Sequence, residues 1–382
     1  MKKIICGILC AALIFANTAV YAGIPKFRYS FEEAAKMAIE NAPNYRGMDS
    51  TIDKASDAYD VQEKVTPKEI RYTGNFKTFV DKQVDSQIKL ENAYTSYQSA
   101  VLSKENIKRD IILNLRRIVI GVQKAEMAYS ETDIGKRNKQ NELELLEIRY
   151  ENGLISRNDY NDSKRKIKDE LKAFDDDGEK AVDLAYRQLN TLLGREDEKD
   201  IEVKLDDTVI PLDKLDLAQI KKDIIKKDTD LNAKYEQRRL TDYKYGLMKE
   251  RYDKYELDKF TDTMRNDMEE MYEEAKRDYE VADKAYENAI DRFEKSFNDM
   301  IEDIEDLYED IEDAKEKIAE EKENRSLYDL KYDSGRMSKL EYDALGDKIT
   351  LLEHELKKLE LDLNMKYAEL LIYSDLKKVV KE

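Results

Sequence analysis

One internal duplication constrains the fold of this chain more than any other feature. The segment from Tyr150 to Tyr160 reads YENGLISRNDY, and the segment from Tyr332 to Tyr342 reads YDSGRMSKLEY. Both carry tyrosine, glycine, serine, an acidic residue and tyrosine at the same spacing. Because a repeated unit fixes an architecture more strongly than local propensity does, we expect two equivalent halves. A fainter match of residues 31–45 with residues 217–231 indicates that each half opens with a short helix.

Apolar periodicity on both sides of each motif predicts pairs of long helices. Ahead of the first motif, apolar residues recur at intervals of three and four from Ile107 to Tyr150, the pattern of one amphipathic helix. A helix from about Asp81 to Tyr150 would be roughly 100 Å long. A near-heptad stripe follows, and near-heptad spacing is typical of helices that pack as a coiled coil. The second half repeats this arrangement with stripes at residues 264–318 and 349–370.

Each motif has the residues that reverse a helical chain. Gly153 supplies the left-handed conformation that ends a helix, and Ser156 can cap the first amides of the next one. Asp159 stands at the capping-box position. The equivalent residues in the second half are Gly335, Ser338 and Glu341. We therefore predict an all-α fold made of two tandem antiparallel coiled-coil hairpins.

Composition agrees with long charged helices. Charged residues make up 40% of the chain and hydrophobic residues 41%, and the charges alternate with the apolar stripes. Only four prolines and twelve glycines interrupt 382 residues. The formal charge of -18 repels phosphate backbones, so a nucleic-acid partner is not expected. Long acidic stretches such as residues 299–313 are interpreted as solvated or lumen-facing carboxylates.

The amino terminus resembles a secretory signal peptide. Lys2 and Lys3 precede an apolar run, and small residues before Gly23 offer a cleavage site. Both cysteines fall inside this segment, which excludes disulfides and cysteine metal sites from the mature chain. We divide the sequence into a signal peptide at 1–22, a first repeat at 23–207 and a second repeat at 208–382. The acidic segment from Glu196 to Asp213 is interpreted as a surface strap between the repeats.

Catalytic chemistry is not expected. His354 is the single histidine, and its charged sequence neighbours predict a solvated side chain on a polar helix face. One histidine supports no catalytic triad. Met264, Met268 and Met271 have the spacing of a buried helix face, so core packing is the preferred interpretation over a metal-binding stripe. No cofactor, metal or enzymatic activity is predicted.

With its two duplicated hairpins, each led by a short helix, the chain resembles the TolC family of efflux-duct proteins. This resemblance implies a homotrimer whose helices close into a hollow cylinder, docked at the hairpin tips by a periplasmic adaptor protein of an export pump. It implies an envelope location, at the outer membrane. The candidate tip residues are Gly153, Leu154, Ser156, Gly335, Met337 and Ser338, and Asp159 and Glu341 are candidates for an acidic entrance constriction.

The sequence departs from the family pattern where the family inserts β-strands between its long helices. Between Val65 and Val80 the apolar residues alternate only in part and Gly74 interrupts them, so this segment can form one short strand or a turn. The matching segment, Tyr252 to Asp267, has the pattern of a charged helix. We therefore expect the β-barrel to be absent or vestigial and membrane association to be indirect or weak. The leading hypothesis is a TolC-like export component. Its rival is a secreted structural coiled coil that spaces or cross-links envelope components without transport.

Overall fold

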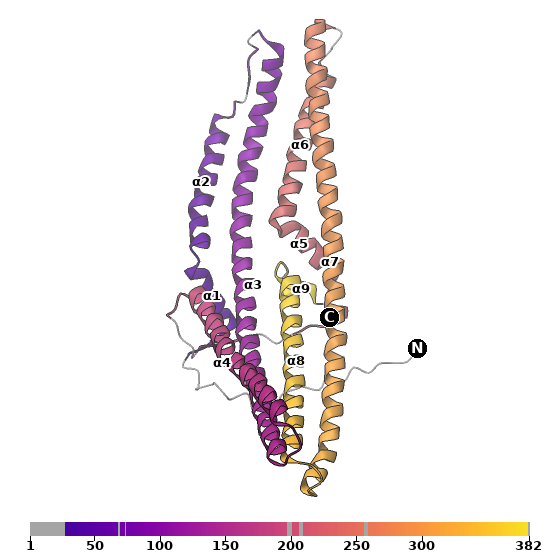
Figure 1. Cartoon of the computed structure of the whole chain (residues 1–382). Helices are drawn as coiled ribbons and strands as arrows, with labels where there is room; N and C mark the ends of the chain where they lie inside the picture. Colours follow the sequence, from indigo (N-terminus) through magenta and orange to yellow (C-terminus); the bar gives the residue numbers. More distant parts are fainter. Residues whose placement is uncertain are drawn as a thin grey trace, which may run out of the picture.

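The structure is a computed structural model that describes residues 27–67, 69–72, 74–196, 201–205, 209–255 and 259–380. The predicted signal peptide lies outside these residues. The described chain is a long helical rod with two repeats (Figure 1). Repeat one contains β1 (Phe27–Ser30), α1 (Phe31–Asn41), α2 (Pro43–Val65), α3 (Phe76–Glu151) and α4 (Arg157–Leu193). After β2 (Ile201–Lys204) and η1 (Leu212–Lys214), repeat two contains α5 (Leu217–Lys227), α6 (Thr229–Lys254), α7 (Asp262–Asp333), α8 (Lys339–Leu371) and α9 (Leu376–Val379).

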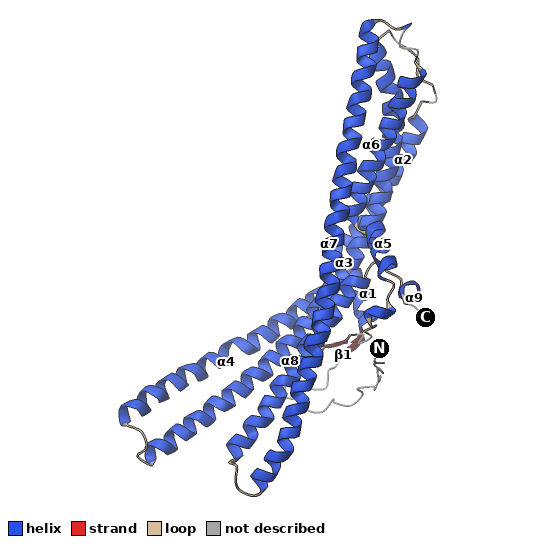
Figure 2. Ribbon diagram, turned by 90° about the vertical axis from the view of Figure 1, so that its right-hand side faces the viewer, coloured by secondary structure: helices blue, strands red, loops and turns tan. Residues whose placement is uncertain are grey.

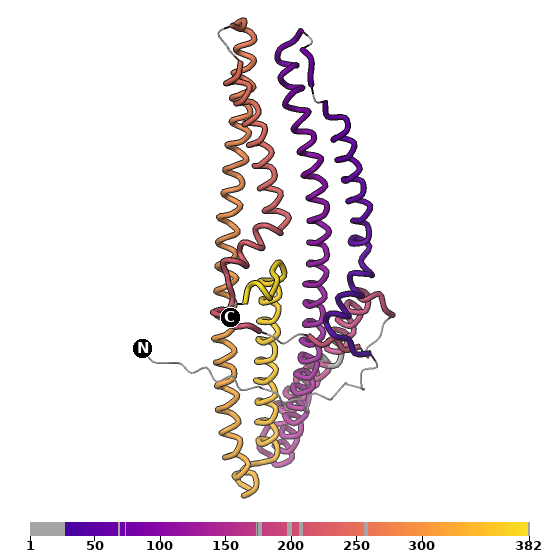
Figure 3. Tube along the Cα trace, turned by 180° about the vertical axis from the view of Figure 1, so that it is seen from behind, coloured from indigo at the N-terminus to yellow at the C-terminus, as the bar shows by residue number. Residues whose placement is uncertain are grey.

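The long helices form a wall with two free edges. In the upper part of the rod, α2 packs on α3, α3 on α6 and α6 on α7. In the lower part the order is α4, α3, α8 and α7, seen as two hairpins in Figure 2. The helices α3 and α7 run through both parts, as the tube in Figure 3 shows. The free edges are therefore α2 and α7 above, and α4 and α7 below.

The two hairpins predicted from the duplication are confirmed. The first reverses between α3 and α4 and the second between α7 and α8, at the two predicted glycines. Buried residues along the helices follow the predicted stripes: Leu115 and Ile304, for example, are fully buried in α3 and α7. Met268 and Met271 are buried as well and belong to a core cluster shared by α3, α6 and α7. The all-α fold follows from this continuous apolar packing.

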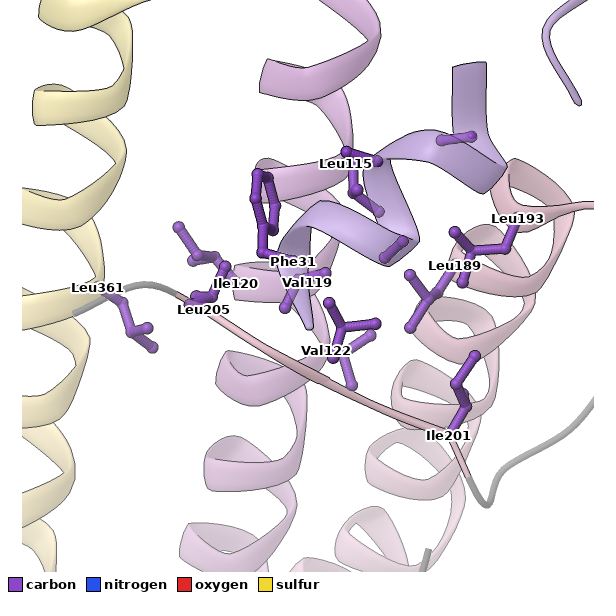
Figure 4. Packing of buried hydrophobic residues seen from close by; sticks show 14 of the residues in the cluster. Phe31, Leu115, Val119, Ile120, Val122, Leu189, Leu193, Ile201, Leu205 and Leu361 are labelled. Carbon is purple, nitrogen blue, oxygen red and sulfur yellow. The ribbon is translucent and has the colours of Figure 1, made fainter. Parts of the chain in front are cut away.

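The interpretation of residues 196–213 as a surface strap is wrong in part. Residues 201–204 form β2, which pairs in parallel with β1 of the first repeat. Ile201, Val203 and Leu205 alternate with exposed residues and are buried against α3 and α4 (Figure 4). The acidic composition of the segment hid this short period-two pattern. The linker is thus part of the core of the first repeat.

The apical connections agree with the sequence prediction for the first repeat, where a turn was allowed, and differ from it for the second. The chain between α2 and α3 makes a turn, with Gly74 at φ 94°, and the long helix starts at Phe76 instead of Asp81. The expected charged helix across Tyr252–Asp267 is interrupted, because α6 ends at Lys254 and α7 starts at Asp262. Ring contacts of 5.0 and 5.7 Å join Phe76 to Phe260 and Tyr255. These aromatic contacts hold the two turns together.

His354 is not solvated, contrary to the prediction. Its side chain is buried between α8 and α3, and Nδ1 lies 3.4 Å from Oε1 of Glu131. The same carboxylate accepts two hydrogen bonds from Lys358, at 2.7 and 2.9 Å. The charged sequence neighbours of His354 face solvent or α7. The side chain of His354 itself faces α3 of the other repeat. Among the described residues, no helix is long and apolar enough to cross a membrane.

Candidate functional site

The two hairpin turns have the same backbone geometry. Gly153 has φ 69° and Gly335 has φ 68°, the left-handed region in which a side chain is strained. The N–H of Gly153 donates to the carbonyl of Tyr150 at 3.0 Å, and that of Leu154 to Arg149 at 2.9 Å. The second turn repeats both bonds at 2.9 and 2.8 Å. This pair of bonds satisfies the last carbonyls of each outgoing helix, so both tips are rigid.

The two acidic candidates are used to cap the returning helices. The hydroxyl of Ser156 accepts from the amide of Asp159 at 3.2 Å and donates to its carboxylate at 2.7 Å. In the second turn, the carboxylate of Glu341 accepts from the amide and the hydroxyl of Ser338, both at 2.9 Å. The bond from the backbone amide, followed by that from the hydroxyl, lowers the pKa of Glu341. Both carboxylates therefore point back along their own hairpin.

Stacked tyrosines brace each turn. The rings of Tyr150 and Tyr160 lie 4.3 Å apart and nearly parallel, and those of Tyr332 and Tyr342 lie 4.6 Å apart. The hydroxyl of Tyr342 donates to Asp329 at 2.8 Å. Tyr150 and Tyr332 therefore pack at the neck of their hairpins, although each keeps 36% of its surface exposed.

The predicted tip residues differ in exposure. Leu154 is 72% exposed, whereas Met337 is half-buried. The repeat register explains the difference, because Met337 corresponds to Ile155, which is also half-buried, and the exposed Leu154 corresponds to Arg336. The two turns therefore present different side chains at the outermost position, one apolar and one cationic.

Sequence reasoning missed an exposed apolar stripe that is duplicated on the outgoing helices. In α3 it consists of Leu145, Ile148 and Tyr150, which are 39, 46 and 36% exposed. The equivalent positions in α7 are Leu327, Leu330 and Tyr332, which are 52, 68 and 36% exposed. We call these six residues the tip stripe. Its signal in the sequence is a set of apolar residues at matching positions of both repeats. The four aliphatic members lie outside the stripe that faces the returning helix, whereas the two tyrosines also stack on that helix.

Ion pairs connect the two repeats in the lower part of the rod. Along the seam between α3 and α8, Lys124 pairs with Asp362 at 2.5 Å and Arg137 with Asp347 at 2.8 Å. Further pairs along the seam are Arg117 with Glu369 and Glu131 with Lys358. The seam is therefore largely polar, in contrast to the apolar packing within each hairpin.

Comparison with solved structures identifies the fold. The chain is similar to the outer-membrane channel OprN, with a TM-score of 0.62, 11% identity, and coverage of 90% of this chain and 89% of that one. It is also similar to VceC of Vibrio cholerae, with a TM-score of 0.56, 13% identity and coverage of 88% and 95%. The corresponding values for the CmeC channel of Campylobacter jejuni are 0.57, 9%, 90% and 85%.

No family model matches the sequence, and no curated protein matches it. At these identities the similarity lies in the path of the chain and not in its residues. The repeats, the hairpin turns and the wall of long helices all take part, because the match covers about nine-tenths of the chain. The chain therefore has a TolC-like helical fold, the fold of these outer-membrane channels.

Proposed function

We propose that the chain is a non-catalytic duct component of an export system in the cell envelope. Three copies close into a ring, and the hairpin tips dock an adaptor protein of a pump. The observation that carries the proposal is the open wall, whose two edges are unlike each other. A surface that joins one edge to the other edge of the next copy is heterologous, and such contacts form a ring when the rotation from copy to copy closes.

Exposed valines support this closure in the upper part of the wall. Val281 on the α7 edge is 72% exposed, and Val65 on the α2 edge is 62% exposed. Lys77 of α3 pairs with Glu270 of α7 at 3.1 Å, which marks one level of the wall. Val281 lies about three helical turns below this level. Tyr59 of α2 contacts Tyr94 of α3, with ring centroids 5.6 Å apart, and this contact fixes the height of α2 against α3. Counting residues along both helices from it places Val65 at nearly the same height as Val281, on the opposite edge.

Analytical ultracentrifugation tests the ring. The mature chain is expected to sediment as a trimer, and Val281→Asp is expected to weaken the trimer at least about tenfold, because a carboxylate would lose its hydration at the closed edge. Leu351→Asp, on the exposed surface of α8 away from both edges, is the matched control and should leave the trimer intact. A monomer at every concentration would exclude the duct and favour the structural coiled coil.

The tip stripe supports docking of an adaptor. Apolar side chains that remain exposed at equivalent places in both repeats are typical of a partner surface, and the rigid turns hold them in a fixed position. Ile148→Asp combined with Leu330→Asp should reduce capture of a co-encoded pump adaptor, used as the probe, by about tenfold or more. Leu376→Asp, which changes an exposed residue far from the tips, provides the control. Unchanged capture with a trimeric double variant would contradict tip docking.

A further inference from the structure

A groove in the upper wall lies between the two repeats, and neither the proposed ring nor the hairpin tips make use of it. Its lining comes from residues 88–99 of α3 and residues 233–244 of α6, with Asp278 of α7 at one end. These stretches of helix are about 16 Å long, so the groove is elongated. Its volume of about 440 Å³ lies within the range of small-molecule sites in proteins.

Neutral polar side chains dominate the lining. Asn92, Thr95 and Ser99 come from α3, and Gln237 and Thr241 come from α6. The side chains of Asn92, Ser99 and Gln237 make no hydrogen bond to another described residue. Amides and hydroxyls both donate and accept hydrogen bonds. The groove therefore offers donors and acceptors from both of its sides.

The charged residues of the lining are already paired. The carboxylate of Glu236 accepts from Nε of Arg239 at 2.7 Å and from the hydroxyl of Thr95 at 3.3 Å. Lys244 forms an ion pair with Asp278 at 3.1 Å. A charged ligand would thus have to displace an existing partner, whereas a neutral ligand would not.

Arg239 fixes the spacing of the two helices at this level. Besides Glu236 on its own helix, its guanidinium donates to Glu91 at 2.9 Å and to Thr95 at 2.8 Å, both on α3. The two sides of the groove are therefore held in place before any ligand enters. A site that is ordered in advance loses less free energy when it binds.

The sequence of α3 is unusual at this level. Residues 86–103 include two charged side chains among 18, in a chain of which 40% is charged. Packing on α2 does not account for the groove residues, because α2 contacts α3 through Tyr94 and Lys104. Asn92 and Ser99 are seven residues apart and so lie together on a different side of the helix. The neutral character of this side belongs to the groove.

We propose that this groove binds a neutral glycan chain of the cell envelope. Sugar hydroxyls match the amides and hydroxyls of the lining, and Ile88 and Leu240 supply apolar surface for the C–H face of a sugar ring. The elongated shape suits linked rings. The formal charge of -18 repels anionic polymers, and the paired carboxylates leave no free ligand for a cation. The choice of an envelope glycan rests on the proposed location of the protein, but the binding chemistry does not.

Calorimetric titration of the mature chain with a tetrasaccharide of N-acetylglucosamine tests the proposal. Saturable binding is expected. Asn92→Asp combined with Gln237→Glu keeps the size of both side chains but removes their amide donors and adds two carboxylates. This double variant should bind the tetrasaccharide at least about tenfold more weakly, because polar groups of the sugar would lose their partners. No saturable binding by the original chain would overturn the proposal.

The matched control carries the same two chemical changes outside the groove. Gln98→Glu combined with Asn138→Asp alters two exposed amides of α3 that are not part of the lining. Its affinity for the tetrasaccharide should stay within about twofold of the original value. Equal weakening in the control and the groove variant would show that overall charge, and not this groove, decides binding, and would overturn the assignment.

Two further probes test the class of ligand. An uncharged peptide of serine and glycine and a sulfated tetrasaccharide should both fail to saturate the groove. Binding of either probe as tightly as the neutral tetrasaccharide would overturn the glycan assignment. These results are independent of the ring, because a chain that sediments as a monomer can still bind sugar, and a trimer that binds no sugar would contradict this inference alone.

Discussion

Ile304→Ala is expected to destabilise the protein by about 4 kcal/mol. Ile304 has no exposed surface and lies in the cluster that joins α7 to α5, α8 and α9, where its neighbours include Leu363 and Leu370. Removing three carbon atoms from a site walled on all sides leaves a cavity that the surrounding helices cannot fill. Urea unfolding followed by far-ultraviolet circular dichroism measures the loss, with the midpoint shifted and the slope unchanged.

Leu330→Ala is the matched control for this prediction. Leu330 lies on the same helix but is 68% exposed, so its truncation should change the free energy of unfolding by no more than about 0.5 kcal/mol. A large loss for both variants would mean that the tip stripe is already covered within one chain. A small loss for both would contradict the buried core of the second repeat.

The hairpins could be predicted because their signals are local and duplicated. A glycine needed for φ 69°, followed three residues later by a capping serine, identifies a reversal without knowledge of the rest of the fold. The apolar stripes on both sides then fix which faces of the helices meet. Duplication extends this local signal to the whole architecture, because a match that recurs at one constant offset indicates two equivalent units and not an accidental similarity.

Contacts between distant segments could not be predicted in the same way. The pairing of β1 with β2 depends on residues 27–30 and 201–204, and the short period-two pattern of each segment does not show which distant segment it pairs with. The separate helix α2 could not be predicted from periodicity, because it has no buried residue to mark an inner face. The burial of His354 could not be predicted either. Charged residues flank it in the sequence, and α3, which is distant in the sequence, covers its side chain.

The candidate site was predicted in position but not in detail. Gly153, Gly335 and the capping serines lie at the tips as expected. The capping boxes could be predicted from residue spacing. Spacing alone does not show that the carboxylates of Asp159 and Glu341 accept hydrogen bonds from the capping serines, which the structure shows. Exposure also decides which tip residues can meet a partner, and exposure depends on how the turn packs. Roles in docking or constriction remain predictions.

Val203→Asp is expected to be the most damaging single change in the linker, with a loss of about 4 kcal/mol or more. Val203 is 4% exposed and packs in the cluster that contains Leu115 and Leu189. A carboxylate at this position would be removed from water without a partner, and β2 would separate from β1. Guanidinium unfolding and the protection of the linker from a protease report the two effects.

The neighbouring Lys204 provides a control that changes the same segment by the same residue type. Its side chain is exposed, so Lys204→Asp adds a carboxylate to solvent and should alter stability by no more than about 0.5 kcal/mol. The two adjacent substitutions should differ in their effect on stability only if the segment is a strand with one buried face. If the segment lay on the surface without a buried face, both substitutions would have the same small effect. Equal, small effects would show that the linker contributes nothing to the core of the first repeat.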